Sequence, residues 1–209
     1  MEKRKILIIK IGSSTLLTHR LCVDEYRMNH IAKQIKMIQD RGWSVLLILS
    51  GAVAVGSRYI DIPTVRSIGK MAAAGIGQVE ILTTTKCIFQ SFGMRIAQVL
   101  LTKDNTNTER KKDMLKTVIS LYIQKKIIPV FNENDVLDLY SFGGNDYLAQ
   151  FLAKLVGVSR VSILSSLKTN GFGVGGGVSK REIVSDLQKM AIPTFLLNGK
   201  KKDCLLEVV

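Results

Sequence analysis

Carboxylates gather in one stretch of an otherwise basic chain. Residues 127–153 contain no Lys or Arg, although the 209-residue chain has 30 of them against 17 acids, a net charge of +13. The acids of this stretch are Glu133, Asp135, Asp138 and Asp146. Such a window suits a cation, either a substrate ammonium group or Mg²⁺. The alternative is that NEND (132–135) and GGND (143–146) are two ordinary turns, because Asn, Asp and Gly are common turn residues.

A lysine followed by glycine and hydroxyl residues indicates a phosphate site near the N-terminus. Lys10 follows the apolar run 6–9 and precedes Gly12 and Ser13. Glycine lets backbone N–H groups approach an anion, and the ammonium group of Lys10 neutralises its charge. The alternative is that Lys10 is an exposed strand end.

A second candidate phosphate site is the glycine-rich stretch 171–180, which includes Val174, Gly175, Gly176 and Lys180. We expect a helix over 181–190, so these residues would lie at its N-terminus, where anions are favoured. Residues 171–176 also fit the pattern GxGxxG. That match is weak, because the acidic residue expected after a second strand is missing. A flexible surface linker is the alternative.

The elements that must position these residues alternate along the chain. Apolar, β-branched runs predict strands, and apolar residues at helical spacing predict helices. We expect strands over 6–9, 44–49, 95–101, 127–131, 160–164 and 194–197. We expect helices over 24–41, 64–90, 108–124 and 181–190, and one that follows Asn145-Asp146 and runs to 156. Leu115, Val118, Ile119 and Tyr122 would lie on the apolar side of the third. The internal glycines of 64–90 indicate close packing against a neighbour.

Each expected strand ends in a polar residue, and these are Lys10, Ser50, Thr102, Asn132, Ser165 and Asn198. Strands alternating with helices predict an α/β fold, with a doubly wound, mostly parallel sheet and helices on both faces. The polar ends would then line one edge of that sheet. After the strand 44–49, Ser50 and Gly51 begin a polar turn in which Ser50 is either a helix N-cap or a donor to a ligand.

The bulk properties are those of one globular domain. Hydrophobic residues make up 46% of the chain and charged residues 22%. No apolar run is long enough to cross a membrane and the N-terminus lacks a signal peptide, so we expect a cytoplasmic protein. Cys22, Cys87 and Cys204 show neither disulfide nor zinc spacing. The basic residues are scattered and aromatic residues are only 6%, which favours solvated surface charge over a nucleic-acid site.

Taken together, the motifs resemble the amino-acid kinase family, and within it the glutamate 5-kinases in a compact form without the C-terminal PUA-type domain of longer relatives. The matching stretches are IIKIGSSTL (8–16), LSGAVAVG (49–56), AGIGQ (74–78), QVLLT (98–102), PVFNEND (129–135), GGND (143–146) and GVGGGVSK (173–180). SGAVAVG combined with NEND is specific to this branch. The resemblance covers nearly the whole chain.

The resemblance implies transfer of a phosphoryl group from ATP, with Mg²⁺ on its phosphates, to the γ-carboxylate of L-glutamate. Catalytic roles would fall to Lys10, Lys180 and Asp146. Glutamate would be held by Ser50, Gly51, Asn132, Asp135 and Asn145. The nucleotide would be held by Lys10, Gly12, Ser13, Ser165, Ser166, Val174, Gly175, Gly176 and Lys180. The amino-acid side would span roughly 1–158 and the nucleotide side 159–209, in a homodimer or larger assembly.

The chain departs from the family pattern at three places. Gly144 stands where the family has Asp, and Ser165-Ser166 stand where it has Thr-Asp. A substantial segment with a GLYxxDP-like stretch is reduced to residues 167–172. All but the first change fall on the nucleotide side, so a catalytically weak relative that binds glutamate or a nucleotide is the alternative function.

Overall fold

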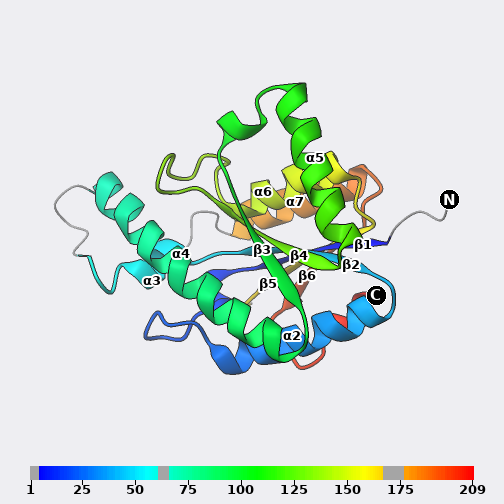
Figure 1. The fold of residues 1–209 in the computed structure, drawn as a ribbon, viewed down its shortest axis with the longest axis horizontal. Coiled ribbons are helices and arrows are strands. Elements are labelled where there is room, and N and C mark those ends of the chain that lie inside the picture. Colours follow the sequence, from blue (N-terminus) through cyan, green and yellow to red (C-terminus); the bar gives the residue numbers. More distant parts are fainter. Residues whose placement is uncertain (1–4, 61–65, 167–176) are drawn as a thin grey trace.

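The computed structural model of the protein describes residues 5–60, 66–166 and 177–209 (Figure 1). Its centre is a sheet of six parallel strands in the order β3-β4-β2-β1-β5-β6. The strands are β1 Ile6–Ile11, β2 Ser44–Leu49, β3 Arg95–Leu101, β4 Ile127–Glu133, β5 Arg160–Ser165 and β6 Thr194–Asn198. The expected α/β, doubly wound parallel fold is confirmed.

Helices cover both faces of this sheet. The helical elements are α1 Ser13–Leu16, α2 Glu25–Asp40, α3 Ala52–Gly56, α4 Arg66–Ser91, η1 Lys103–Thr106, α5 Glu109–Gln124, α6 Asn145–Val156, α7 Gly177–Lys189 and η2 Leu206–Val208. One apolar cluster packs the four helices α1, α2, α3 and α4 against one face of the sheet. A second apolar cluster packs α5, α6 and α7 against the opposite face. Figure 1 shows α2 and α4 on one side of the strands and α5, α6 and α7 on the other.

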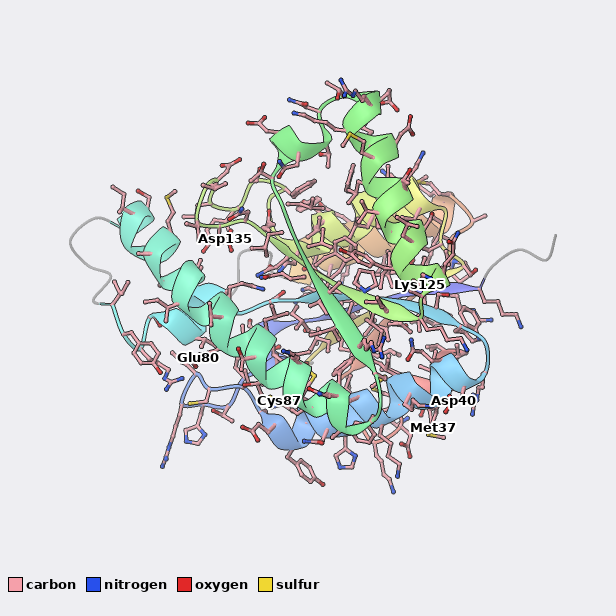
Figure 2. The ribbon with its side chains drawn as sticks, in the orientation of Figure 1. Met37, Asp40, Glu80, Cys87, Lys125 and Asp135 are labelled. Carbon is pink, nitrogen blue, oxygen red and sulfur yellow. The ribbon has the colours of Figure 1, made fainter. Side chains whose placement is uncertain are left out.

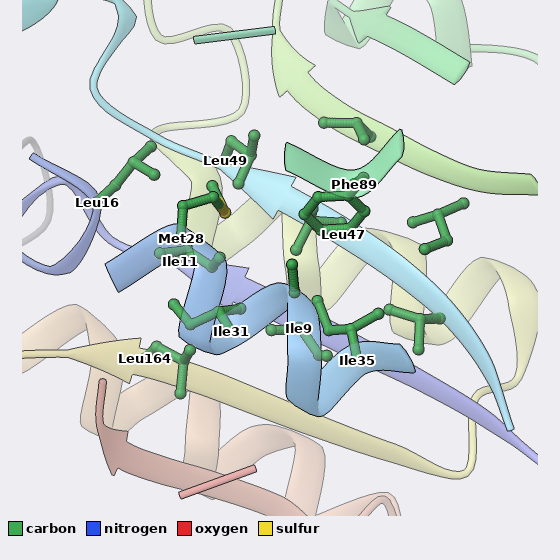
Figure 3. Packing of buried hydrophobic residues seen from close by; sticks show 14 of the residues in the cluster. Ile9, Ile11, Leu16, Met28, Ile31, Ile35, Leu47, Leu49, Phe89 and Leu164 are labelled. Atoms are coloured by element: carbon green, nitrogen blue, oxygen red, sulfur yellow. The ribbon is translucent and has the colours of Figure 1, made fainter. Parts of the chain in front are cut away.

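The alternation of β1 divides its side chains between these two layers, because successive residues of a strand point to opposite faces. Leu7, Ile9 and Ile11 belong to the cluster with α2 and α4. Figure 3 shows Ile9 and Ile11 beside the apolar residues of α2. Ile6 and Ile8 belong to the cluster with α6 and α7. Lys10 follows the same register, so it faces the α6 side of the sheet.

Glycine allows α3 and α4 to approach each other at backbone distance. A Cβ built on Gly77 would lie 1.9 Å from the Ala52 carbonyl oxygen, and one on Gly56 would lie 1.8 Å from that of Ala73. Any side chain at either position would force the helices apart. The close packing expected for the glycines of this helix is therefore confirmed at Gly77, and it fixes Gln78 beside the sheet.

The connections create two topological switch points. β1 and β2 lead into helices on one face, whereas β3, β4 and β5 lead into α5, α6 and α7 on the other. This division follows from right-handed crossovers, since the chain first moves outward across the sheet and then returns. A switch point lies between two neighbouring strands whose following connections go to opposite faces of the sheet. The pairs β1/β5 and β2/β4 are such neighbours. Ligands of open α/β sheets bind beyond the carboxyl ends of strands at such points.

Several sequence-based boundaries were wrong. β1 extends to Ile11 and β4 to Glu133, so Lys10 and Asn132 lie within paired strands and not after them. α7 begins at Gly177, so Lys180 lies in its first turn and not before the helix. Tertiary pairing and packing extended these elements beyond their apolar runs. Val118 of α5, expected on the apolar side, is 40% exposed. Ile119 is the one residue of that helix that is buried.

Among the described residues, none of the helices combines the length and apolar character that a membrane span requires.

Candidate active site

The N-terminus of α6 links the two switch points. Its first two residues, Asn145 and Asp146, point to different partners because consecutive helical positions lie about 100° apart around the axis. Asn145 contacts the ends of β2 and β4, and Asp146 contacts Lys10 of β1. One helix end thus holds both halves of the predicted site in register.

At the β2/β4 switch point, Asn145 is the centre of a hydrogen-bond network. Its Nδ2 lies within hydrogen-bond distance of the Leu49 carbonyl oxygen (2.9 Å), Ser50 Oγ (3.0 Å) and Asn132 Oδ1 (2.6 Å). Asn132 Nδ2 in turn donates to Gln78 Oε1 at 2.8 Å. These bonds join β2, β4, α4 and α6, and they bring together three of the residues predicted to hold glutamate.

Two details of this network have chemical consequences. Gly51, not Ser50, is the N-cap of α3, so the reading of Ser50 as a helix cap was wrong. The φ of 107° at Gly51 is one that only glycine adopts easily. Asn145 Oδ1 is buried and makes no hydrogen bond to any described residue. A buried amide oxygen without a donor is costly, so it is available to an N–H group of a ligand.

Asp135 and Glu133 lie where β4 ends (Figure 2 labels Asp135). Asp135 Oδ1 accepts the backbone N–H of Tyr140 at 3.0 Å. Burial raises the pKa of Asp135, and it also raises the pKa of Glu133. Burial dominates because neither carboxylate takes part in an ion pair with a described residue. An ionised Asp135 would therefore be stabilised by a cationic ligand.

At the β1/β5 switch point the central contact is an ion pair. Lys10 Nζ lies 2.7 Å from Asp146 Oδ1, and the two residues are only 5% and 4% exposed. The pKa of Lys10 is lowered mainly by burial, while Asp146 opposes this shift and the positive charge of Lys180 adds to it. Two neighbouring ammonium groups, of which one is buried, favour an anion between them.

The remaining contacts at this point are longer. Lys180 Nζ lies 3.4 Å from Ser165 Oγ, and Ser14 Oγ accepts the Ser166 N–H at 3.3 Å. Ser13 begins α1 directly after β1. The Gly12 N–H donates to the Leu164 carbonyl oxygen at 2.9 Å, so this amide is already hydrogen-bonded to the neighbouring strand β5. A Cβ on Gly12 would lie 3.2 Å from the Leu164 carbonyl oxygen, so a side chain here would crowd the end of β5.

Some predicted site residues do not join this arrangement. Val174, Gly175 and Gly176 lie outside the described residues. The polar strand ends of the two edge strands make local structure: Thr102 caps η1 together with Asn105, and Asn198 accepts the N–H of Lys200 in a turn. Neither residue takes part in the contacts described above at the two switch points.

The four carboxylates of residues 127–153 do not converge on one cation. Glu133 and Asp135 accept backbone N–H groups, Asp146 pairs with Lys10, and Asp138 is exposed. The described residues contain no group of three or more His, Cys, Asp or Glu that could hold a metal ion. NEND and GGND also include turns. The backbone carbonyl oxygen of Asn134 accepts the N–H groups of Leu137 and Asp138, and the Gly143 N–H donates to the backbone carbonyl oxygen of Tyr140.

The sequence did not predict the contacts of Glu133 or the hydrogen bond that the Leu49 carbonyl oxygen accepts, and it indicated a role for Gln78 only weakly. Glu133 Oε1 accepts the backbone N–H groups of Phe142 and Gly144. These partners lie nine and eleven residues away across an irregular loop, a separation with no local pattern. The Leu49 carbonyl carries no side-chain signal at all.

Some known proteins are similar to this chain in sequence, and others are similar to it in fold. The glutamate 5-kinase of Clostridium tetani is 27% identical over 242 residues, covering 98% of this chain and 91% of the relative. Glutamate 5-kinase 1 of Bacillus licheniformis is 34% identical over 172 residues, covering 80% of this chain and 47% of the relative. The glutamate 5-kinase of Geobacter sulfurreducens is 29% identical, and the chain spans 65% of its length.

The alignment with the Clostridium tetani relative has 242 positions against 209 residues here, so at least 33 of its positions have no counterpart in this chain. This agrees with the shortening expected from the resemblance. Among solved structures, an isopentenyl phosphate kinase of T. acidophilum superposes with a TM-score of 0.66 at 17% identity, covering 93% of this chain and 92% of that one. UMP kinase of Ureaplasma parvum superposes with 0.61 at 14% identity, covering 99% and 95%. At these identities the superpositions establish the fold alone.

The sequence pattern of the amino acid kinase family matches residues 5–168, which include both switch points and all of the described contacts between β1, β2, β4 and α6. The chain therefore belongs to the amino acid kinase family.

Proposed function

We propose that this protein transfers the terminal phosphoryl group of ATP to the γ-carboxylate of L-glutamate, giving L-glutamyl 5-phosphate, the first step of proline biosynthesis. The observation that carries this proposal is the α6 N-terminus, where Asn145 serves one switch point and Asp146 the other. Phosphoryl transfer requires donor and acceptor to be held in line at short distance. The names of the similar proteins support the choice of glutamate.

The β2/β4 switch point offers groups that match an α-amino acid. Within the described part of the chain, no group donates to the buried Asn145 Oδ1 and no cation pairs with the buried carboxylate of Asp135. An α-ammonium group would satisfy both. Ser50 Oγ and the amides of the network supply polar groups that suit the α-carboxylate. Because these groups are fixed by hydrogen bonds to one another, a ligand would not have to order them on binding.

The β1/β5 switch point offers the positive charge that ATP requires. Lys10 is held by Asp146 and stands beside Lys180, so the two ammonium groups would stabilise the charge that develops on the transferred phosphoryl group. Mg²⁺ would enter with the phosphates of ATP, whose oxygens it neutralises. The γ-carboxylate of glutamate is a nucleophile at neutral pH. Its oxygen attacks the γ-phosphorus, the bond to the ADP oxygen breaks, and no protein base is needed.

The test measures ADP release and acyl phosphate formation by the purified protein with Mg·ATP. With L-glutamate, we expect glutamate-dependent ADP release and, in the presence of hydroxylamine, an equal amount of γ-glutamyl hydroxamate. N-acetyl-L-glutamate lacks the ammonium group and L-aspartate is one carbon shorter, so both should be poor acceptors. ADP release that is independent of glutamate, or faster with either analogue, would contradict the proposal.

A second candidate is a weak or inactive relative that binds glutamate or a nucleotide as a sensor or partner subunit. The specific observation in its favour is the absence of at least 33 positions that the Clostridium tetani relative has. This candidate predicts calorimetric binding of glutamate or ATP without hydroxamate formation. The retained pair of lysines favours the kinase, because binding alone has no need of two ammonium groups beside a reacting phosphate.

A further inference from the structure

Glu133 is a buried carboxylate to which the proposed reaction gives no role. It is the last residue of β4, it is 4% exposed, and its Oε1 accepts the backbone N–H of Phe142 at 2.6 Å and that of Gly144 at 3.4 Å. No ion pair of the described residues includes it. Burying a carboxylate is costly unless it is hydrogen-bonded, so these two hydrogen bonds offset part of that cost.

These two N–H groups belong to the turn that leads into α6. Gly144 is the N-cap of that helix and has φ 112° and ψ 161°, a region essentially restricted to glycine. An L-residue with a capping side chain would be strained in this backbone. Glu133 accepts the N–H of Gly144 itself, the same group that the Glu of a capping box accepts, and so ties this turn to β4. A negative charge at this end of α6 also interacts favourably with the helix dipole.

The residues that follow Gly144 are Asn145 and Asp146, which carry the contacts at the two switch points. A turn that can shift would shift both residues together. We propose that Glu133 is a positioning residue, which fixes the N-terminus of α6 through its hydrogen bonds to Phe142 and Gly144 and thereby holds Asp146 against Lys10 and Asn145 against Asn132. Its kinetic consequence rests on the proposed function, whereas its structural consequence does not.

Three substitutions separate the reach of this side chain from its charge. Glu133→Gln keeps an acceptor oxygen at the same distance but removes the charge. Glu133→Asp keeps the charge but is one carbon shorter, so it cannot reach both N–H groups. Glu133→Ala removes the acceptor. Asp138→Asn is the matched control, because Asp138 is an exposed carboxylate of the same loop that lies outside the site. Circular dichroism checks that each variant is folded.

The first readout is the titration of Lys10, followed by NMR on protein with ¹³C-labelled lysine. Asp146 raises the pKa of Lys10, so a displaced Asp146 lowers the pH at which Lys10 titrates. We expect a lower pH in Glu133→Asp and Glu133→Ala, and no change in Glu133→Gln or Asp138→Asn. A structural role remote from α6 would lower stability without moving this titration.

The second readout is the turnover number with glutamate and Mg·ATP. A misplacement on the order of 1 Å can cost on the order of 100-fold, so we expect that loss in Glu133→Asp and Glu133→Ala and less than about threefold in Glu133→Gln and Asp138→Asn. An unchanged Lys10 titration in Glu133→Asp and Glu133→Ala would overturn the proposal. The proposal would also be overturned if Glu133→Asp matched the parent in both readouts while Glu133→Gln matched Glu133→Ala. If Lys10 shifts as expected but the parent protein shows no glutamate-dependent turnover, the proposed function fails and the positioning role stands.

Discussion

The β2/β4 and β1/β5 switch points are built from different interactions. At β2/β4, neutral amides and a hydroxyl form bonds of 2.6 to 3.0 Å that tie four elements together. At β1/β5, one buried ion pair is accompanied by contacts of 3.3 and 3.4 Å. One half is thus a fixed polar network, and the other is a concentration of charge.

This difference predicts a division of labour. Directional hydrogen bonds discriminate among ligands, because a ligand that leaves a buried polar group unpaired loses much of its binding energy. The attraction between the lysine ammonium groups and a phosphoryl group depends less on direction, so it stabilises the phosphoryl group of any nucleotide. We therefore expect substrate selectivity to reside at β2/β4 and rate acceleration at β1/β5.

The largest expected effect is that of Lys10→Ala. Loss of the ammonium group that faces the transferred phosphoryl should lower kcat on the order of 100-fold, about 3 kcal/mol of transition-state stabilisation. The KM for glutamate should change little, because the proposed function places glutamate at the other switch point. Steady-state kinetics measures both constants, with Lys36→Ala, which breaks a surface pair with Asp40, as the control. Near-normal turnover would remove Lys10 from the phosphate site.

The next effect is that of Asp135→Asn at the β2/β4 side. The amide can still accept the Tyr140 N–H, but the substrate ammonium would lose its charge partner. The KM for glutamate should rise on the order of 30-fold, about 2 kcal/mol, with a smaller change in kcat. Asp138→Asn, an exposed carboxylate nearby, controls for the loss of one negative charge. An unchanged KM would move the amino acid away from β2/β4.

A smaller effect is expected when the base of the nucleotide is changed. The resemblance implies that Ser165-Ser166 lack a carboxylate on the nucleotide side and that the shortened segment has lost residues that would cover the base. Affinity should then come mainly from the phosphates, so ATP should bind weakly and GTP should bind within about tenfold of ATP, or about 1.4 kcal/mol. Binding should weaken as salt is added. Calorimetry at two salt concentrations tests this, and tight, salt-insensitive binding with a strong preference for ATP would contradict it.

The smallest expected effect is a shift in pH dependence. Lys10 must be protonated to act on phosphate, and its pKa is already below that of an ordinary lysine because of burial. Asp146 opposes that shift, so Asp146→Asn should lower the pKa further and move the alkaline loss of kcat to lower pH. Removing Lys180, which lowers the same pKa, should move the Lys10 titration in the opposite direction when it is followed by NMR. Shifts of the same sign in both variants would contradict the arrangement.

Much of the fold was predictable because it depends on neighbours in sequence. The apolar runs of β1 and β2 and the helical spacing of α2 are local patterns, and all six strands were expected close to where they lie. Family resemblance added the residues of the site. The short helix α1 was not expected, since it has only one turn and little periodicity. A helix start near α3 was expected only as one of two readings of Ser50. The ends of β4 and α7 were misplaced because pairing and packing extend an element beyond its apolar residues.

The sequence by itself determined that polar residues would follow the apolar runs of the strands, because an apolar run and the residues that follow it form a local pattern. It did not determine that Lys10 lies within β1. It did not determine which of those polar ends would meet. Ser50 and Asn132 come together because β2 and β4 are adjacent in the sheet, while Thr102 and Asn198 are left on its edges. Strand order, the bridge made by Asn145 and Asp146, and the reach of Glu133 to the turn before α6 depend on contacts between distant parts of the chain. Such contacts follow from the packing of the whole molecule, and only the tertiary structure decided them.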